Sequence, residues 1–278
     1  MTTDSATPSP VRRYLALALV GVIGGVLSGA FGVGGGIVMV PLLIWLVRFD
    51  QRHAAATSLV AILPTAIAGA STYLVQGEVN VIAGLLIAAG GIVGSIIGTR
   101  LLKRLPLGWL RWLFIALLVV VAVQTILEPP SRGVDLELTT WTIVGLVGLG
   151  LAMGIAAGLF GIGGGVVAVP VLIALFGMGD LVAKGTSLLA MIPTATTGSI
   201  ANIRNRLVRL SDGLIVGVFA TGASFGGVAL AFWMEPRIAA ILFALLVLFT
   251  SVQLSIRAIK AHRAARKDKP DTDGPAAS

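Results

Sequence analysis

The sequence contains no cysteine, only two histidines and few charged residues, which make up 12% of its 278 positions. The lack of cysteine excludes disulfides, thiolate metal ligands and redox-active thiols. A soluble domain carries roughly 25% charged residues, so this chain is not expected to be soluble. No cluster of His, Asp or Glu indicates metal or hydrolytic chemistry. We therefore expect no catalytic residue, no metal, no cofactor and no enzyme activity.

In place of charge, the sequence has long apolar runs. Hydrophobic residues make up 56% of the chain and the mean hydropathy is +1.00. Many runs reach the roughly 20 residues that a membrane-spanning helix needs. They lack the alternation of barrel strands, so they are predicted to be helices of an all-α, polytopic integral membrane protein. The runs cover residues 14–30, 36–47, 55–75, 81–99, 109–127, 139–160, 165–177, 185–203, 212–233 and 237–256.

A long segment of the chain occurs twice. Residues 29–69 align with residues 158–198 at a constant offset of 129, and about 21 of the 41 positions are identical. Both copies contain a glycine cluster, FGVGGG or FGIGGG, followed by a proline. A duplicated apolar unit interrupted by glycine is typical of secondary transporters.

The repeat also defines the expected organisation of the chain. Arg12-Arg13 before the first apolar run resembles a signal peptide, but the same segment recurs near residues 142–158, so we expect it to remain as a membrane helix. The expected parts are a cytoplasmic N-terminus (1–13), a first transmembrane repeat (14–127), an external linker (128–138), a second transmembrane repeat (139–257) and a disordered basic and polar cytoplasmic tail (258–278).

The distribution of loop charge predicts the topology. Basic residues gather at 12–13, 48–52, 100–111, 204–209 and in the tail, whereas 76–80, 128–138, 177–184 and 234–237 carry few. One assignment puts every basic segment in the cytoplasm: each glycine-broken pair returns to the side where it began, and the other three helices of each half cross singly. The halves are then inverted repeats in the cell inner membrane, with both termini cytoplasmic. The short segments 36–47 and 165–177 favour a hairpin or half-helices.

The glycine clusters are candidates for an anion site. Glycine permits positive φ and close backbone approach, and the free N–H groups of a helix that starts there attract an anion. Two such starts could bind a small anion without a buried Arg or Lys. The alternative is that these glycines only let helices pack closely. The candidate substrate-binding glycines are Gly32, Gly34, Gly35, Gly36, Gly161, Gly163, Gly164 and Gly165.

Repeated prolines and hydroxyl residues extend this candidate site. Prolines inside an apolar segment are expected to kink it or free a carbonyl. The Thr-Ser pairs lie two helical turns before the Pro-Thr pairs and so share faces with them. Their hydroxyls either line a polar path, bond across helices or satisfy carbonyls of their own helix. These candidates are Pro41, Thr57, Ser58, Pro64, Thr65, Pro170, Thr186, Ser187, Pro193 and Thr194.

Other glycines are predicted to serve packing. Gly90, Gly94 and Gly98 recur every four residues, and Gly222 and Gly226 do so in the second half, as in small-xxx-small helix contacts. The GVGGG stretch lacks the Gly-Lys-Ser/Thr ending of a phosphate loop. The pI of about 10.8 is explained by loop and tail residues rather than by nucleic-acid binding.

Taken together, FGVGGGIVMVPLL and FGIGGGVVAVPVL, each followed by a TSL segment and an LPT or IPT turn, resemble the sulfite exporter TauE/SafE family of membrane permeases. The resemblance extends over about residues 14–257. It implies an inner-membrane protein of two repeated halves that moves sulfite, organosulfonates or related small anions, and the family motif falls on the glycines, prolines and Thr-Ser pairs named above.

The predicted function is a secondary transporter for a small anion, which an inside-negative potential would favour exporting. An anion channel and a non-transporting membrane scaffold are the alternatives. The expected partners are the small anion and the lipid bilayer, with no nucleic acid, and a homo-oligomer is left open.

Overall fold

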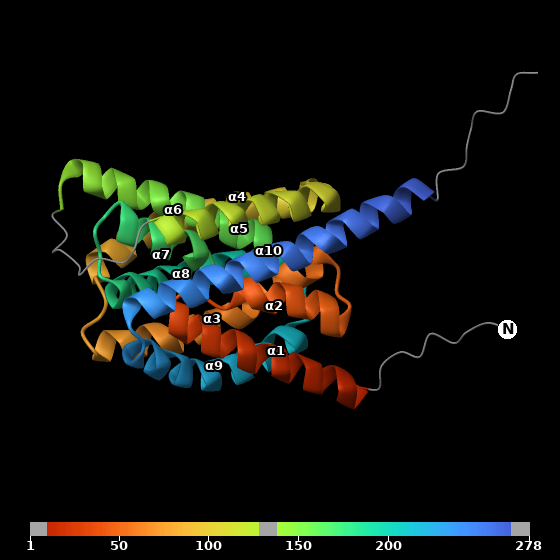
Figure 1. Cartoon of the computed structure of the whole chain (residues 1–278), viewed down its shortest axis with the longest axis horizontal. Coiled ribbons are helices and arrows are strands. Elements are labelled where there is room, and N and C mark those ends of the chain that lie inside the picture. Colours follow the sequence, from red (N-terminus) through yellow and green to blue (C-terminus); the bar gives the residue numbers. More distant parts are fainter. Residues whose placement is uncertain (1–9, 128–137, 268–278) are drawn as a thin grey trace, which may run out of the picture.

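The computed structural model describes residues 10–127 and 138–267, which form helices joined by short turns (Figure 1). Within these ranges there is no strand, so the prediction of an all-α polytopic membrane protein is confirmed. The first half contains α1 (Pro10–Phe31), α2 (Gly36–Leu42), the π-helical turn η1 (Leu43–Val47), α3 (Gln51–Val75), α4 (Val81–Arg104) and α5 (Leu107–Leu127). The second contains α6 (Thr140–Phe160), α7 (Gly165–Ala174), α8 (Asp180–Arg204), α9 (Leu210–Trp233) and α10 (Pro236–Lys267).

The duplication extends to the helix boundaries. The offset of 129 that aligns the motifs also relates the starts of α2 and α7, of α3 and α8, of α4 and α9, and of α5 and α10. Helices α1, α3, α4, α6, α9 and α10 are long and apolar enough to cross a membrane. Most of the linker (128–137) and the end of the tail (268–278) lie outside the described residues, as do residues 1–9; α10 continues to Lys267.

In each half, a long helix is followed by a short one that turns back. Gly35 and Gly164 have φ of +70° and +85°, and their carbonyls accept the first hydrogen bonds of α2 and α7. Arg13, near the start of α1, lines the same cavity as Val47, the last residue of η1, and the following residues 48–50. The first pair therefore returns to the end of the bundle where α1 begins, which we call the N-terminal end.

The prolines are accommodated within helices. Pro64 and Pro193 lie inside the continuous helices α3 and α8, as the apolar runs 55–75 and 185–203 predict, and the LPT and IPT motifs form no separate turn. Membrane helices tolerate proline because neighbouring groups satisfy the freed backbone atoms. Pro41 lies inside α2, which changes to π geometry two residues later, whereas α7 stays α-helical through Pro170.

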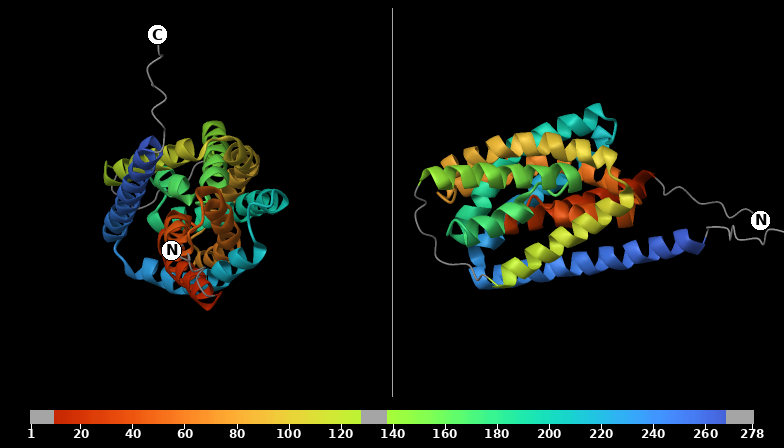
Figure 2. Two further views of the ribbon diagram at one scale, coloured as in Figure 1. Left: turned by 90° about the vertical axis from the view of Figure 1, so that its right-hand side faces the viewer. Right: turned by 90° about the horizontal axis from the view of Figure 1, so that it is seen from above.

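The contacts between helices also recur when each helix is replaced by its equivalent in the other half. Helix α4 lies along α6, as α1 lies along α9; α3 contacts α9, as α8 contacts α4. Helices α3 and α8 meet each other, and α5 pairs with α10 along one side of the bundle (Figure 2). Each of these contacts joins the two halves.

Glycines bring the helix backbones together at the α4–α6 contact. A Cβ on Gly90, Gly94 or Gly98 would collide with backbone atoms of α6, so these three have the packing role predicted for them. Gly222 and Gly226 face open space, and their predicted packing role is wrong. The glycine of α9 that packs against α1 is Gly227, one position further along the helix.

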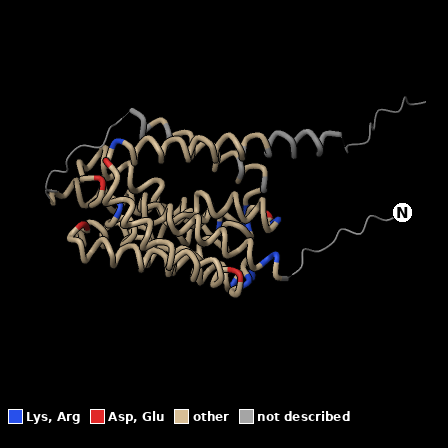
Figure 3. Tube along the Cα trace, turned by 60° about the horizontal axis from the view of Figure 1, so that its bottom comes forward, with Lys and Arg blue, Asp and Glu red and all other residues tan. Residues whose placement is uncertain are grey.

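Charged residues gather toward the two ends of the bundle, with long uncharged stretches of chain between them (Figure 3). The start of α1 and the end of α10 lie at the same end (Figure 1). This distribution is that of a protein whose middle lies in lipid.

The glycine contacts predict a contrast between two single methyl additions. We expect Gly94→Ala to destabilise the protein by about 1–3 kcal/mol, because the new Cβ must displace the α6 backbone. Gly222→Ala should be neutral or slightly stabilising, since alanine favours helix over glycine. The measurement is the thermal unfolding midpoint in detergent, and equal midpoints for the two variants would contradict the assignment.

Candidate functional site

The two glycine segments cross at the centre of the bundle. A Cβ on Gly36 would meet the backbone of Gly161 and Ile162, and one on Gly165 would meet that of Gly32 and Val33. The start of each short helix therefore lies directly against the broken segment of the other half. Because backbone meets backbone here, only glycine fits at these positions.

Two serines hold this crossing together. Ser58 of α3 donates a hydrogen bond to the carbonyl of Gly161, and Ser187 of α8 donates one to the carbonyl of Gly32 at 2.5 Å. Both hydroxyls and both carbonyls are equivalent under the offset of 129. Each serine thus satisfies the broken segment of the opposite half, which is the cross-helix bonding that was one of the alternatives for these residues.

The centre between the glycine segments is apolar. Gly34 and Gly163 both approach the side chains of Ile62 and Met191, which are themselves equivalent positions and are fully buried. The cavities at the end of α8 and at the start of α3, described below, are not lined by the candidate glycines. In this conformation these glycines pack helices together, and their role in anion binding stays a prediction.

The four threonine candidates lie in three different surroundings. Thr65 and Thr194 bond carbonyls of their own helices, at Ala61 and Ala190, both at 2.8 Å. Thr186 accepts a hydrogen bond from the backbone N–H of Asn80 at 2.9 Å. Thr57, in contrast, lines a cavity. Its position differs from that of the other three threonines, whose hydroxyls are engaged in the hydrogen bonds just described.

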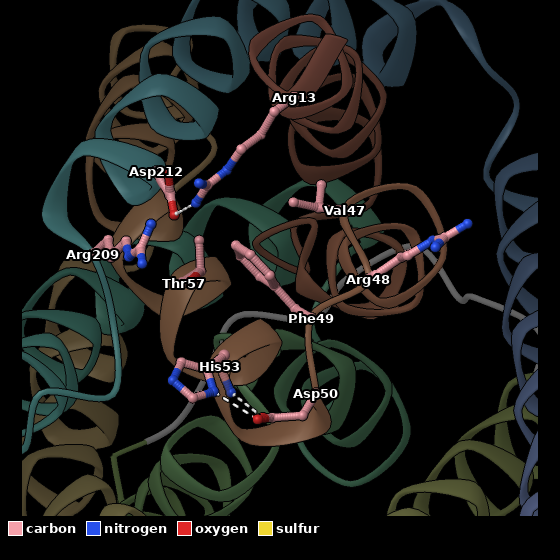
Figure 4. A pocket seen from close by; sticks show the side chains of 9 residues that line it. All are labelled: Arg13, Val47, Arg48, Phe49, Asp50, His53, Thr57, Arg209 and Asp212. Atoms are coloured by element: carbon pink, nitrogen blue, oxygen red, sulfur yellow. Dashed lines mark hydrogen bonds and ion pairs between the residues drawn. The ribbon is translucent and has the colours of Figure 1, made fainter. Parts of the chain in front are cut away.

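That cavity has a volume of about 450 Å³ and lies at the N-terminal end (Figure 4). Its walls come from the starts of α1, α3 and α9 and from the turn after η1. Thr57 is buried and lies one helical turn deeper along α3 than the exposed His53. The lining residues are Arg13, Val47, Arg48, Phe49, Asp50, His53, Thr57, Arg209 and Asp212.

The cavity carries three arginines against two carboxylates. Arg13 pairs with Asp212 at 2.6 Å; their side chains are 29% and 5% exposed. The Arg13 guanidinium also lies 5.9 Å from the centre of the Phe49 ring. Arg209 lies beside Asp212, whereas Arg48 turns away from the other lining residues (Figure 4). Among the described residues neither Arg209 nor Arg48 forms an ion pair, so Arg209 supplies positive charge to the cavity.

Asp50 caps the helix that forms one wall. It accepts hydrogen bonds from the backbone N–H of His53 at 2.8 Å and from the His53 ring at 2.7 Å. Burial raises the pKa of Asp50, but the hydrogen bonds from His53 outweigh it and hold that pKa below its usual range. The cap is therefore ionised at neutral pH, and its stabilising contribution is lost only as the pH falls below about 4.

The opposite end of the molecule contains a buried ion pair. Lys184 and Asp180, one turn apart on α8, lie 2.6 Å from each other, and their side chains are only 3% and 10% exposed. The backbone of Lys184 packs against Gly32, at the crossing of the broken segments. At the equivalent place in the first half, Ala55 packs against Gly161.

Sequence reasoning missed these charged residues as parts of a site. Arg13, Arg209, Asp180 and Lys184 entered the argument as charges in loops or at the N-terminus, and not as parts of a binding site. The spacing of four between Asp180 and Lys184 was a usable signal, because residues four apart share a helix face. Nothing in the sequence indicated the pairing of Arg13 with Asp212, which lie 199 positions apart.

The structure is a bundle of membrane-spanning helices with two equivalent halves and broken helices at its centre, and a charged cavity lies at one end. These features are typical of membrane transporters. Within this class, the sulfite exporter TauE/SafE profile matches residues 2–125 and 146–277, and the chain belongs to that family.

Named relatives agree with this class. The probable membrane transporter protein YunE of Bacillus subtilis is 28% identical over 237 residues, covering 77% of this chain and 86% of that protein. YdhB of the same organism, also named a probable membrane transporter protein, is 28% identical over 222 residues, or 76% and 89% of the two chains. A probable membrane transporter protein of Xylella fastidiosa is 32% identical over 206 residues, or 72% and 76%.

The buried ion pair predicts strong coupling between its partners. Lys184→Met alone should destabilise the protein by about 3–5 kcal/mol, because Asp180 would be left buried without its partner. The double variant Asp180→Asn/Lys184→Met should recover most of that loss. The unfolding midpoints of Lys184→Met, Asp180→Asn and the double variant complete a double-mutant cycle. If the losses of the two single variants add up in the double variant, the predicted coupling is contradicted.

The serines at the crossing predict a second effect on stability. Ser58→Ala and Ser187→Ala should each cost about 1–3 kcal/mol, since a buried carbonyl loses its donor. Ser71→Ala is the matched control on α3, because the Ser71 hydroxyl bonds only its own helix, at Ala68. If Ser71→Ala lowers the unfolding midpoint as much as Ser58→Ala does, the hydrogen bonds between the halves contribute no more to stability than a hydrogen bond within one helix.

Proposed function

We propose that this protein is a secondary transporter for a small oxyanion, such as sulfite or an organosulfonate. The observation that carries the proposal is Arg209, an arginine without an ionic partner in the described structure, which faces a cavity that leads to Thr57. The name of the family supports the same class of substrate.

The chemistry of the cavity suits such an anion. Sulfite and sulfonates present three oxygen acceptors around a sulfur atom, and the planar guanidinium of Arg209 can donate two parallel hydrogen bonds to them. The Thr57 hydroxyl can donate a third. Asp212 does not cancel this charge, because Arg13 neutralises it at 2.6 Å.

We further propose that the two halves are inverted in the membrane. Two observations support this: the helix boundaries recur at the offset of 129, and α6 begins at the end of the bundle opposite to the start of α1 (Figure 1). By the positive-inside rule the N-terminal end is cytoplasmic, because it carries Arg13, Arg48, Arg52, Arg100, Lys103, Arg204 and Arg209. The protein then lies in the cell inner membrane with both termini in the cytoplasm.

A comparison of the two ends supports alternating access. The counterparts of Arg13, Phe49, His53 and Arg209 at the offset of 129 are Thr142, Met178, Val182 and Asn80. Met178 is buried, and Thr186, the counterpart of Thr57, is bonded to the backbone of Asn80. We infer that this conformation is open to the cytoplasm and closed at the opposite end.

Between the two ends, the candidate glycines would bind the anion in an intermediate conformation. The side chains of Ile62 and Met191 would have to move away from the crossing to make room. Methionine is suited to such movement because its unbranched side chain repacks readily. An inside-negative membrane potential would then favour export of the anion, by about 2.3 kcal/mol per unit charge per 100 mV.

The test is flux of labelled sulfite into proteoliposomes, with sulfate, taurine and sulfoacetate as competitors. We expect saturable flux that Arg209→Gln lowers about tenfold or more, the loss expected for a hydrogen bond to a charged group. Thr57→Val should lower flux as well. Arg12→Gln is the matched control, because Arg12 is exposed at the same end and does not line the cavity.

Each outcome separates the proposal from its alternatives. Counterflow driven by unlabelled anion identifies a carrier, whereas unsaturable flux without counterflow identifies an anion channel. No flux of any tested anion through folded protein would leave the scaffold alternative. Equal flux for Arg209→Gln and Arg12→Gln would overturn the role given to Arg209.

A further inference from the structure

A second cavity, also of about 450 Å³, lies between the C-terminal ends of α4 and α8. Three basic residues line it: Arg100 and Lys103 from α4, and Arg204 from α8. No acidic residue lines it, and none of the three forms an ion pair within the described ranges 10–127 and 138–267. Like charges held this close repel one another, so the cavity favours an anion that is not part of the protein.

The walls of this cavity also include apolar side chains. Ile96 lies one helical turn before Arg100, and Ile200 lies one turn before Arg204. Both isoleucines are exposed. Each helix therefore presents a cation at the end of the bundle and an apolar side chain one turn closer to the middle of the membrane. A phospholipid has the same order, with a charged phosphate at the surface and acyl chains below it.

The repeat provides an internal comparison for this cavity. At the offset of 129, the counterparts of Arg100, Lys103 and Arg204 are Ala229, Phe232 and Val75. Those residues lie at the C-terminal ends of α9 and α3, which pack together as α4 and α8 do. Since the equivalent helix ends pack without a cation, neither the fold nor the helix dipole requires these three charges.

We propose that this cavity binds the headgroup of an anionic phospholipid. Arg100, Lys103 and Arg204 contact the phosphate, and the acyl chains lie against Ile96 and Ile200. Basic cavities between membrane helices recognise such headgroups. Thr197 and Asn205, which also line the cavity, can hydrogen-bond the polar part of the headgroup. This site is separate from the cavity at Arg209 and does not depend on the proposed transport function.

The test uses the full-length protein in detergent. Phosphatidylglycerol and phosphatidylcholine with identical acyl chains are titrated in turn, and retained lipid is counted by native mass spectrometry alongside the unfolding midpoint. We expect phosphatidylglycerol to bind at least tenfold more tightly than phosphatidylcholine. Arg100→Gln/Lys103→Gln/Arg204→Gln should lose at least tenfold in affinity for phosphatidylglycerol.

A matched triple variant separates a built site from general attraction. Arg12→Gln/Arg48→Gln/Arg206→Gln removes the same charge from exposed residues outside this cavity, and it should keep its affinity within about twofold. Equal losses in the two triple variants would overturn the proposal. If the first triple variant does not fold, Arg204→Gln alone should still weaken binding several-fold, and unchanged binding would overturn the proposal.

Two further measurements distinguish the lipid from a free anion. Inorganic phosphate should raise the unfolding midpoint less than phosphatidylglycerol does, and it should not displace the lipid. Ile200→Ser, which installs the residue present at the equivalent position 71, should weaken lipid binding without altering any response to phosphate. Full displacement by inorganic phosphate would show that the site takes the free anion and would overturn the lipid assignment.

Discussion

The rest of the structure depends on two hydrogen bonds that the halves exchange at the centre of the bundle. A helix that breaks inside a membrane exposes carbonyls that no water can satisfy. Here Ser58 satisfies Gly161 and Ser187 satisfies Gly32, so neither half can keep its broken segment without the other. The glycines make this exchange sterically feasible, since any side chain would separate the two backbones. The break in each half is therefore stabilised by the other half.

The two ends of the molecule, on either side of that crossing, differ in their charged residues. One end opens as a cavity lined by Arg209, which forms no ion pair among the described residues, and the other end contains the buried Lys184–Asp180 pair. Since both ends derive from the same repeated unit, the difference arises from substitutions at equivalent positions rather than from a different fold.

Much of the fold could be predicted from the sequence, because apolar run length and the duplicated motif are both strong local signals. The glycine contacts at Gly90, Gly94 and Gly98 followed from their spacing, but the same spacing misled at Gly222 and Gly226, where no described residue lies close to that face of α9. The partners of Ser58 and Arg13 could not be predicted, since they lie 103 and 199 positions away. Long-range pairing is a property of tertiary packing, which local patterns do not encode.

The shared helix boundaries also determine where the chain can accept a change in length. Every added residue rotates the rest of a helix by about 100° and advances it by 1.5 Å. One insertion in the middle of α4 would turn Gly94 or Gly98 away from α6, and one in α3 would carry Ser58 or Pro64 to a different face. The two halves can therefore diverge by substitution and keep the fold, but insertions or deletions within a helix would disrupt it. Insertions belong in the connections between helices.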